Sequence, residues 1–206
     1  MQSYGAPDST KGPDPKTRRI FDIKIQEASD AFDKDDYATT RKKVEEANAL
    51  LPDQPAVINL RGAVFYKEKK YEEALVAFQD LIAHDTNSYP GYFNTAEVLL
   101  AQKKYDEALA GFERILEARP KDEVCMYRIV LVLSLKGEID EARRWAKTIP
   151  NPGLTAAYYF ANAAIELIAG QAQKGEDWIK QSEIFFPAED SKTLRSVLVE
   201  HDLIKK

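Results

Sequence analysis

The chain has 206 residues, of which 44% are hydrophobic and 31% charged, a composition that suits folded domains and excludes a disordered or low-complexity chain. Its net charge of −5 argues against a protein that binds a nucleic-acid backbone, because such a protein needs a basic face. The single cysteine, Cys125, excludes an internal disulfide and a paired-thiol metal or redox site.

The first 14 residues are predicted to form a flexible polar tail, because Gly5, Pro7, Gly12 and Pro13 interrupt them and no apolar core is present. No stretch of the chain approaches the ~20 apolar residues that span a bilayer, so no direct transmembrane segment is expected. Such a tail can follow a removed export signal, and cytosolic proteins carry similar tails. The sequence therefore leaves both a cytoplasmic and a periplasmic location open.

A helix is predicted to follow the tail over about Pro15–Phe32, since Asp14 and Pro15 form an N-cap and first-turn pair. From here a period of 34 residues organises the chain, and each period divides into two helical patterns joined by a short polar turn. The first pattern carries a small residue such as Gly62, which lets two helices approach closely. The positions that recur with this period are Tyr37, Tyr71 and Tyr105; Ala74 and Ala108; Phe78 and Phe112; and Ala28, Gly62 and Ala96.

This pattern resembles the tetratricopeptide repeat, whose period is 34 residues. The resemblance implies an all-α fold, a right-handed superhelix (solenoid) of about five helix-turn-helix repeats with a C-terminal capping helix. The first repeat departs from the pattern at Thr40 and Val44, and Pro150 is expected to end the second helix of the fourth repeat early. The repeat array is predicted over residues 15–188, with repeats near 21–54, 55–88, 89–122, 123–155 and 156–188.

Residues 189–206 are predicted to form the capping helix. A repeat array needs a terminal element that is apolar on its inner side and polar on its outer side. The apolar stripe of this segment comprises Leu194, Val197, Leu198, His201 and Ile204.

The resemblance also implies that the first helix of each repeat lines a concave groove that binds a segment of another protein. The corresponding positions carry aromatic side chains around a small polar centre, and we expect them to bind an extended apolar or aromatic partner segment. The predicted groove residues are Tyr66, Phe93, Asn94, Tyr127, Arg128 and Phe160. Arg128 is expected to hold a partner carboxylate or carbonyl. Without a partner it is expected to pair with Glu97, Asn94 or water, so that Arg128→Ala weakens binding with little loss of stability.

Two alternatives to this groove remain open from the sequence. The aromatic rings can pack between repeats or lie beneath the protein's own tail, and Arg128 can be a surface residue paired with Glu123 or Asp122. The chain can instead be a structural module that forms homo-oligomers, since its last repeat carries apolar residues, namely Trp178, Ile184, Phe185 and Phe186.

The sequence contains no motif for catalysis, for a cofactor or for a metal. His84 and His201 are far apart in the repeat order and have no nucleophile or carboxylate at catalytic spacing. Cys125 is expected to be a buried small hydrophobe, and the acidic run Asp30–Asp36 lacks the Gly and Glu of a calcium loop. We therefore interpret the protein as a non-catalytic protein–protein interaction scaffold. Bacterial assembly, secretion or envelope proteins of this type are similar in size, so by analogy of fold we expect a role in such a process.

Overall fold

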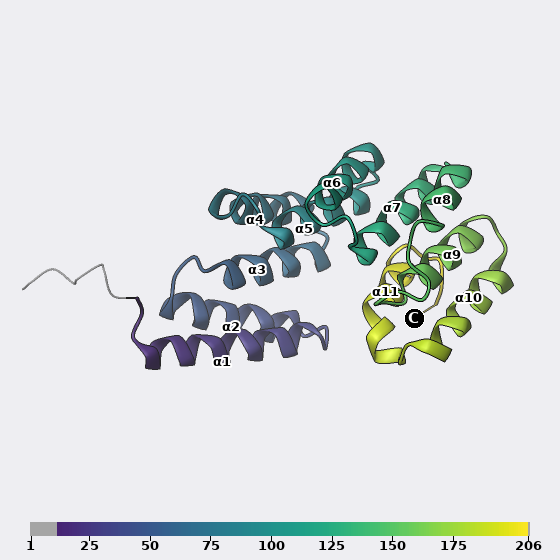
Figure 1. Ribbon diagram of the computed structural model, residues 1–206. Coiled ribbons are helices and arrows are strands. Elements are labelled where there is room, and N and C mark those ends of the chain that lie inside the picture. The colour runs from purple at the N-terminus through teal and green to yellow at the C-terminus, as the bar shows by residue number, and fades with distance from the viewer. Residues whose placement is uncertain (1–11, 206) are drawn as a thin grey trace, which may run out of the picture. The chain divides into compact units, whose positions relative to one another are not determined.

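The computed structural model describes residues 12–205, which form eleven α-helices and contain no strand (Figure 1). The all-α class is therefore confirmed, whereas the predicted tail over residues 1–11 lies outside the described residues. The chain divides into two compact units, the first ending at Gly91 and the second beginning at Tyr92. In chain order the helices are α1 (Pro15–Phe32), α2 (Tyr37–Leu50), α3 (Pro55–Lys67), α4 (Tyr71–His84), α5 (Tyr89–Ala101), α6 (Tyr105–Ala118), α7 (Glu123–Lys136), α8 (Ile139–Ala146), α9 (Ala157–Ile168), α10 (Ala172–Phe185) and α11 (Ala188–Glu200).

Aspartate side chains fix the starts of three helices. Asp14 accepts a hydrogen bond from the Thr17 amide at 2.9 Å, and this N-cap with Pro15 in the first turn begins α1 at the predicted residue. Asp36 caps α2 and Asp122 caps α7 in the same way. These caps satisfy amide groups that the helix itself leaves without a partner.

The turn between the two helices of each pair is the same from repeat to repeat. One residue in it has a positive φ, between 58° and 90°, and Gly supplies the last two of these positions. A left-handed residue ends a helix sharply, and Gly adopts this conformation without the steric cost of a Cβ. The equivalent residues are Asp35, Lys69, Lys103, Gly137 and Gly170. These positions are 34 residues apart as far as Gly137, and Gly170 follows 33 residues later, so the turns carry the repeat into the weakly patterned C-terminal half.

The N-terminal unit has one apolar core between α1, α2 and α3, and α4 packs against α3. Gly62 makes the closest approach in this packing, because a Cβ added to it would lie 2.6 Å from Cε1 of the buried Phe78 ring. The small position predicted in the first helix is therefore required by the helix packing. The core residues are Phe21, Ala28, Val44, Ala47, Val57 and Leu60.

The C-terminal unit is built around α7, which packs against α6, α8 and α9. Every residue from Cys125 to Ser134 is buried, so this helix has no solvent-exposed side along most of its length. The helix α8 ends at Ala146, which confirms the early end predicted for the fourth repeat. In turn, α9 packs against α10 and α11.

A buried carboxylate holds the connection between α8 and α9. Both oxygens of Glu123 accept hydrogen bonds, from the Leu154 amide at 2.8 Å and from the Thr155 amide and hydroxyl at 2.8 and 2.7 Å. A Cβ on Gly153 would lie 2.7 Å from the same carboxylate, so only Gly allows the backbone to approach it. Glu123 therefore fixes this loop against the start of α7.

Candidate functional site

The six predicted groove residues lie on first helices of the pairs, but in both units. Tyr66 lies on α3 of the N-terminal unit, and the others belong to the C-terminal unit: Phe93 and Asn94 on α5, Tyr127 and Arg128 on α7, and Phe160 on α9. Four of these five are linked by direct contacts. We call the surface formed by Phe93, Tyr127, Arg128 and Phe160 the first-helix face.

Arg128 is the centre of the first-helix face. Its side chain is only 2% exposed, and its Nε donates a hydrogen bond to Glu97 Oε1 at 2.7 Å. Its guanidinium carbon lies 5.1 Å from the ring centre of Tyr127 and 5.6 Å from that of Phe93, within cation–π range. The expected pairing with Glu97 is confirmed, and the alternative of a surface arginine is wrong.

Burial and charge oppose each other at Arg128. Burial alone would lower the pKa of the guanidinium, but the charge of Glu97 and the other neighbouring groups raise it above its ordinary value. The arginine therefore stays charged inside the unit. A buried charge of this kind depends on its partner, because its hydration is lost on folding.

The other half of the first-helix face lies beneath α11. Tyr127 is fully buried, its hydroxyl donates to the Leu194 carbonyl of α11 at 3.3 Å, and its ring meets that of Phe160 edge-on with centres 6.4 Å apart. Figure 1 shows α11 returning beside α9. The side of α11 that is buried carries Ser191, Leu194, Val197 and Leu198. Of the alternatives open from the sequence, covering by the chain itself thus describes Tyr127, which α11 contacts, and packing between repeats describes Phe160, whose buried ring meets that of Tyr127.

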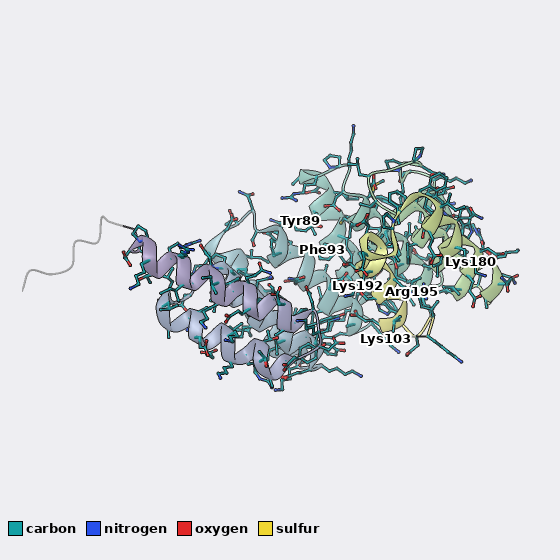
Figure 2. All side chains as sticks on the ribbon, turned by 90° about the horizontal axis from the view of Figure 1, so that it is seen from below. Tyr89, Phe93, Lys103, Lys180, Lys192 and Arg195 are labelled. Atoms are coloured by element: carbon teal, nitrogen blue, oxygen red, sulfur yellow. The ribbon has the colours of Figure 1, made fainter. Side chains whose placement is uncertain are left out.

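The outer side of α11 is polar and carries charges of both signs, with Glu189, Asp190 and Glu200 exposed as well as two basic residues. Lys192 and Arg195 are exposed there, and Figure 2 shows them on this helix together with Phe93 on α5 of the same unit. His201 follows directly after α11. Burial and the positive charge of Arg128 lower the pKa of its imidazole, and these effects outweigh the negative charges of Glu200 and Asp202, which raise it. The segment predicted as a capping helix therefore has an apolar inner side and a polar outer side. Its predicted extent over residues 189–206 is wrong at the C-terminal end, because the helix ends at Glu200 and His201 and Ile204 lie beyond it.

Two aromatic residues of the predicted groove, Tyr66 and Phe93, are only half-buried. Tyr66 is half-buried on α3, with its ring 6.1 Å from that of Tyr71, centre to centre. Phe93 is half-buried on α5 and meets the buried Phe112 ring at 5.5 Å. Asn94, beside Phe93, is also half-buried. These three residues are the part of the predicted groove that retains solvent contact.

A second group of aromatic rings surrounds Tyr159 at the end of the last helix pair. The Phe185 ring stacks on Tyr159 with an interplanar angle of 19°, and Trp178 and Phe186 also contact it. The side chains of Ile184 and Phe185 nevertheless stay 74% and 60% exposed. The predicted apolar surface of the last repeat therefore exists in part, on α10.

The described residues hold no arrangement that points to metal binding, since no group of three or more His, Cys, Asp or Glu side chains among residues 12–205 could hold a metal ion. Cys125 is buried as predicted, its Sγ donates to the Phe112 carbonyl at 3.1 Å, and burial raises the pKa of its thiol to about 12. His84 is exposed, with Nδ1 2.9 Å from the Asp80 carbonyl oxygen. Within the described part of the chain, no helix is long and apolar enough to span a membrane.

The helix pairs, their repeated turns and their sequential packing define a helical repeat protein. The family model described as the tetratricopeptide repeat matches residues 65–125 and 99–165, and the chain belongs to this family. Tetratricopeptide-repeat proteins are in general protein-interaction scaffolds and in general not enzymes. No curated protein matches the chain.

Solved structures share the fold at low sequence identity. The structure of TTC0263, a thermophilic TPR protein in Thermus thermophilus, has a TM-score of 0.69 and 18% identity, covering 91% of this chain and 100% of that chain. MamA 41-end from Desulfovibrio magneticus RS-1 has a TM-score of 0.59 and 14% identity, covering 87% and 100%. An O-GlcNAc transferase mutant from Thermobaculum terrenum has a TM-score of 0.54 and 14% identity, covering 74% of this chain and 27% of that chain. At these identities the likeness shows the fold alone.

Proposed function

We propose that the protein is a non-catalytic scaffold that binds a segment of a partner protein on the first helices of its repeats, in a bacterial assembly, secretion or envelope process. The observation that carries the proposal is the aromatic first-helix face, to which the chain's own α11 is already docked. A surface that holds one amphipathic segment through Tyr127 has the chemistry to hold another. In the C-terminal unit, the half-buried Phe93 and Asn94 supply contacts outside the part that α11 covers, and the half-buried Tyr66 offers an aromatic contact of its own in the N-terminal unit.

Partner binding is tested by selecting peptides from a displayed library on the full-length protein and measuring the affinity of the enriched sequences. We expect the library to yield extended apolar or aromatic sequences. Tyr66→Ala and Phe93→Ala should each lower their affinity, because an aromatic ring offers a large contact area and loses little side-chain entropy when it is fixed by a partner. Val76→Ala is the matched control, because Val76 is 67% exposed on the second helix α4. Unchanged affinity in both aromatic variants would reject binding on the first helices.

A second candidate function is self-association through the last helix pair. The exposed Ile184 and Phe185 on α10 support it, because large apolar side chains that share a surface are often buried by a partner. Sedimentation over the micromolar range separates the two functions. A dimer that Ile184→Ser and Phe185→Ser abolish would favour self-association, and a monomer at every concentration would remove it.

A further inference from the structure

Exposed large apolar side chains gather on two helices, α1 and α10. Six such side chains are exposed among residues 12–205, and four of them lie on these helices: Ile20, Ile23, Ile184 and Phe185. Ile20 and Ile23 share one side of α1, since residues three apart on a helix are neighbours, and Ile184 and Phe185 lie in the last turn of α10. A terminal helix pair that acts only as a cap is expected to be polar on its outer side, and neither of these helices meets that expectation.

The repeat shows what the apolar side of α1 is shaped to contact. The equivalents of Ile23 in the next three first helices follow at intervals of 34 residues, and all are buried: Val57, Gly91 and Cys125. A Cβ on Gly91 would lie 2.7 Å from Cγ1 of Ile82 on α4, and Cys125 Sγ donates to the Phe112 carbonyl of α6 at 3.1 Å. Both α4 and α6 are second helices of the preceding pair. The position of Ile23 is therefore one at which a first helix packs on a preceding second helix.

The helix α10 leaves the matching side of a second helix open. The second helices α2, α6 and α8 each pack against the first helix that follows them, whereas α11 packs against α9 and makes no comparable contact with α10 within residues 12–205. Counted from the start of each helix, Glu183 of α10 stands where α4 carries Ile82. Glu183 is exposed, as are Ile184 and Phe185 after it. The side of α10 on which a following first helix would pack is thus uncovered.

The charges of these two helices are complementary in one orientation. The start of α1 carries the exposed Lys16 and Arg19, with no acidic residue in its first turn, and Arg19 shares the side of Ile23 four residues later. The last turn of α10 carries Glu183 and no basic residue, and the first turn of α11 adds two acidic residues. Both helices therefore carry charges that their own dipoles disfavour. An antiparallel contact, the usual arrangement of helices joined by short turns, would bring the basic start of α1 to the acidic end of α10.

We propose that α1 of one copy docks on α10 of a second copy, so that the chains associate head to tail. The inference rests on self-association, the second candidate function, and names the two surfaces that meet. Ile20 and Ile23 cover Ile184 and Phe185, and Arg19 pairs with Glu183. A second α10 is a poorer occupant of α10, because it would bring the same acidic end against itself. Since the two surfaces differ, each pair of copies keeps one free surface of each kind and can add a third copy.

The head-to-tail contact is tested by sedimentation velocity of the full chain with one substitution on each surface. Ile23→Glu changes the α1 surface and Ile184→Glu the α10 surface, at side chains that are 48% and 74% exposed, and circular dichroism verifies that both variants fold. Val76→Glu is the matched control, since Val76 is 67% exposed on α4. Wild type and Val76→Glu should form species larger than a dimer as the concentration rises, and the other two variants should associate at least about tenfold more weakly.

Mixing the two variants separates a head-to-tail contact from a symmetric one. An equimolar mixture of Ile23→Glu and Ile184→Glu should form a one-to-one complex and nothing larger, because each variant brings the intact surface that the other lacks. A mixture that stays monomeric would overturn the inference. Association that Ile184→Glu abolishes and Ile23→Glu leaves unchanged would also overturn it, while self-association through α10 would stand. A wild-type monomer at every concentration would reject both.

The pairing of Arg19 with Glu183 has a test of its own. Arg19→Glu and Glu183→Arg should each weaken the association severalfold, because each places like charges across the contact. The variant that carries both substitutions should recover the association, since the exchanged charges attract again. A double variant that associates as weakly as the single variants would overturn the orientation in which α1 docks.

Discussion

Replacing Arg128 by Met is expected to destabilise the C-terminal unit by about 4–5 kcal/mol. The substitution keeps most of the side-chain volume but leaves the Glu97 carboxylate, which is 14% exposed, without its buried counter-charge. Breaking a buried ion pair costs about 3–5 kcal/mol, and the remaining exposure of Glu97 favours the low end. Contacts with two aromatic rings add about 0.5–1 kcal/mol each. The sequence predicts little change of stability for a substitution at Arg128, whereas its burial predicts a large one.

The double variant Arg128→Met/Glu97→Gln should recover most of this loss, because replacing both charges removes the uncompensated carboxylate. Arg144→Met is the matched control, since Arg144 forms a similar pair with Glu141 in the same unit but is 66% exposed, where such pairs contribute about 0–1 kcal/mol. Both tryptophans of the chain, Trp145 and Trp178, lie in the C-terminal unit, so urea unfolding followed by tryptophan fluorescence reports on this unit. A loss in Arg128→Met no larger than in Arg144→Met would refute the reasoning.

Three further changes are expected to have measurable effects. Gly62→Ala should destabilise the N-terminal unit by about 1–3 kcal/mol, measured by circular dichroism in urea, because the buried Phe78 ring leaves no room for a Cβ; full stability would show that the ring can move. Glu123→Ala removes the acceptor of three hydrogen bonds, so the Leu154 and Thr155 amides should lose their protection from hydrogen exchange, and retained protection would contradict the role of this carboxylate. The pKa of His201 is lower in the folded protein than its ordinary value of 6.5, so the docking of α11 should be strongest above pH 6.5 and weaken as the pH falls below it. Hydrogen exchange of α11, corrected for intrinsic rates, should lose this pH dependence in His201→Gln; a dependence that persists would assign the titration to another group.

Much of the fold could be predicted from the sequence, because the same helix-pair pattern recurs in each repeat. The 34-residue spacing predicts the helix pairs, and Asp14 with Pro15 predicts the first residue of α1. The same spacing places Phe93, Tyr127, Arg128 and Phe160 on equivalent helices, and their contacts agree with this. That a partner binds there stays a prediction.

The covering of the face by α11 did not follow from the repeat, because a period describes neighbouring repeats and not a segment that folds back. A signal for it is nevertheless present in α7. Between Val124 and Leu135 only Arg128 and Ser134 are strongly polar, and a helix that is apolar all round must be buried all round. An open groove would leave one side of this helix in water. Glu123 gave no signal at all, since an acidic residue at a helix start is ordinary on the surface.

The reactivity of the Cys125 thiol can report on the packing of the helices around it. Only the thiolate reacts with alkylating reagents, and this thiol is buried, bound to the Phe112 carbonyl, and has its pKa raised to about 12. Because the chain has no other cysteine, every labelled molecule records one separation of α6 from α7. Labelling kinetics under native conditions would therefore measure how often the packing between these two repeats opens, without any engineered residue. The same protection should keep the thiol from oxidation to a sulfenic acid for as long as the two helices stay packed.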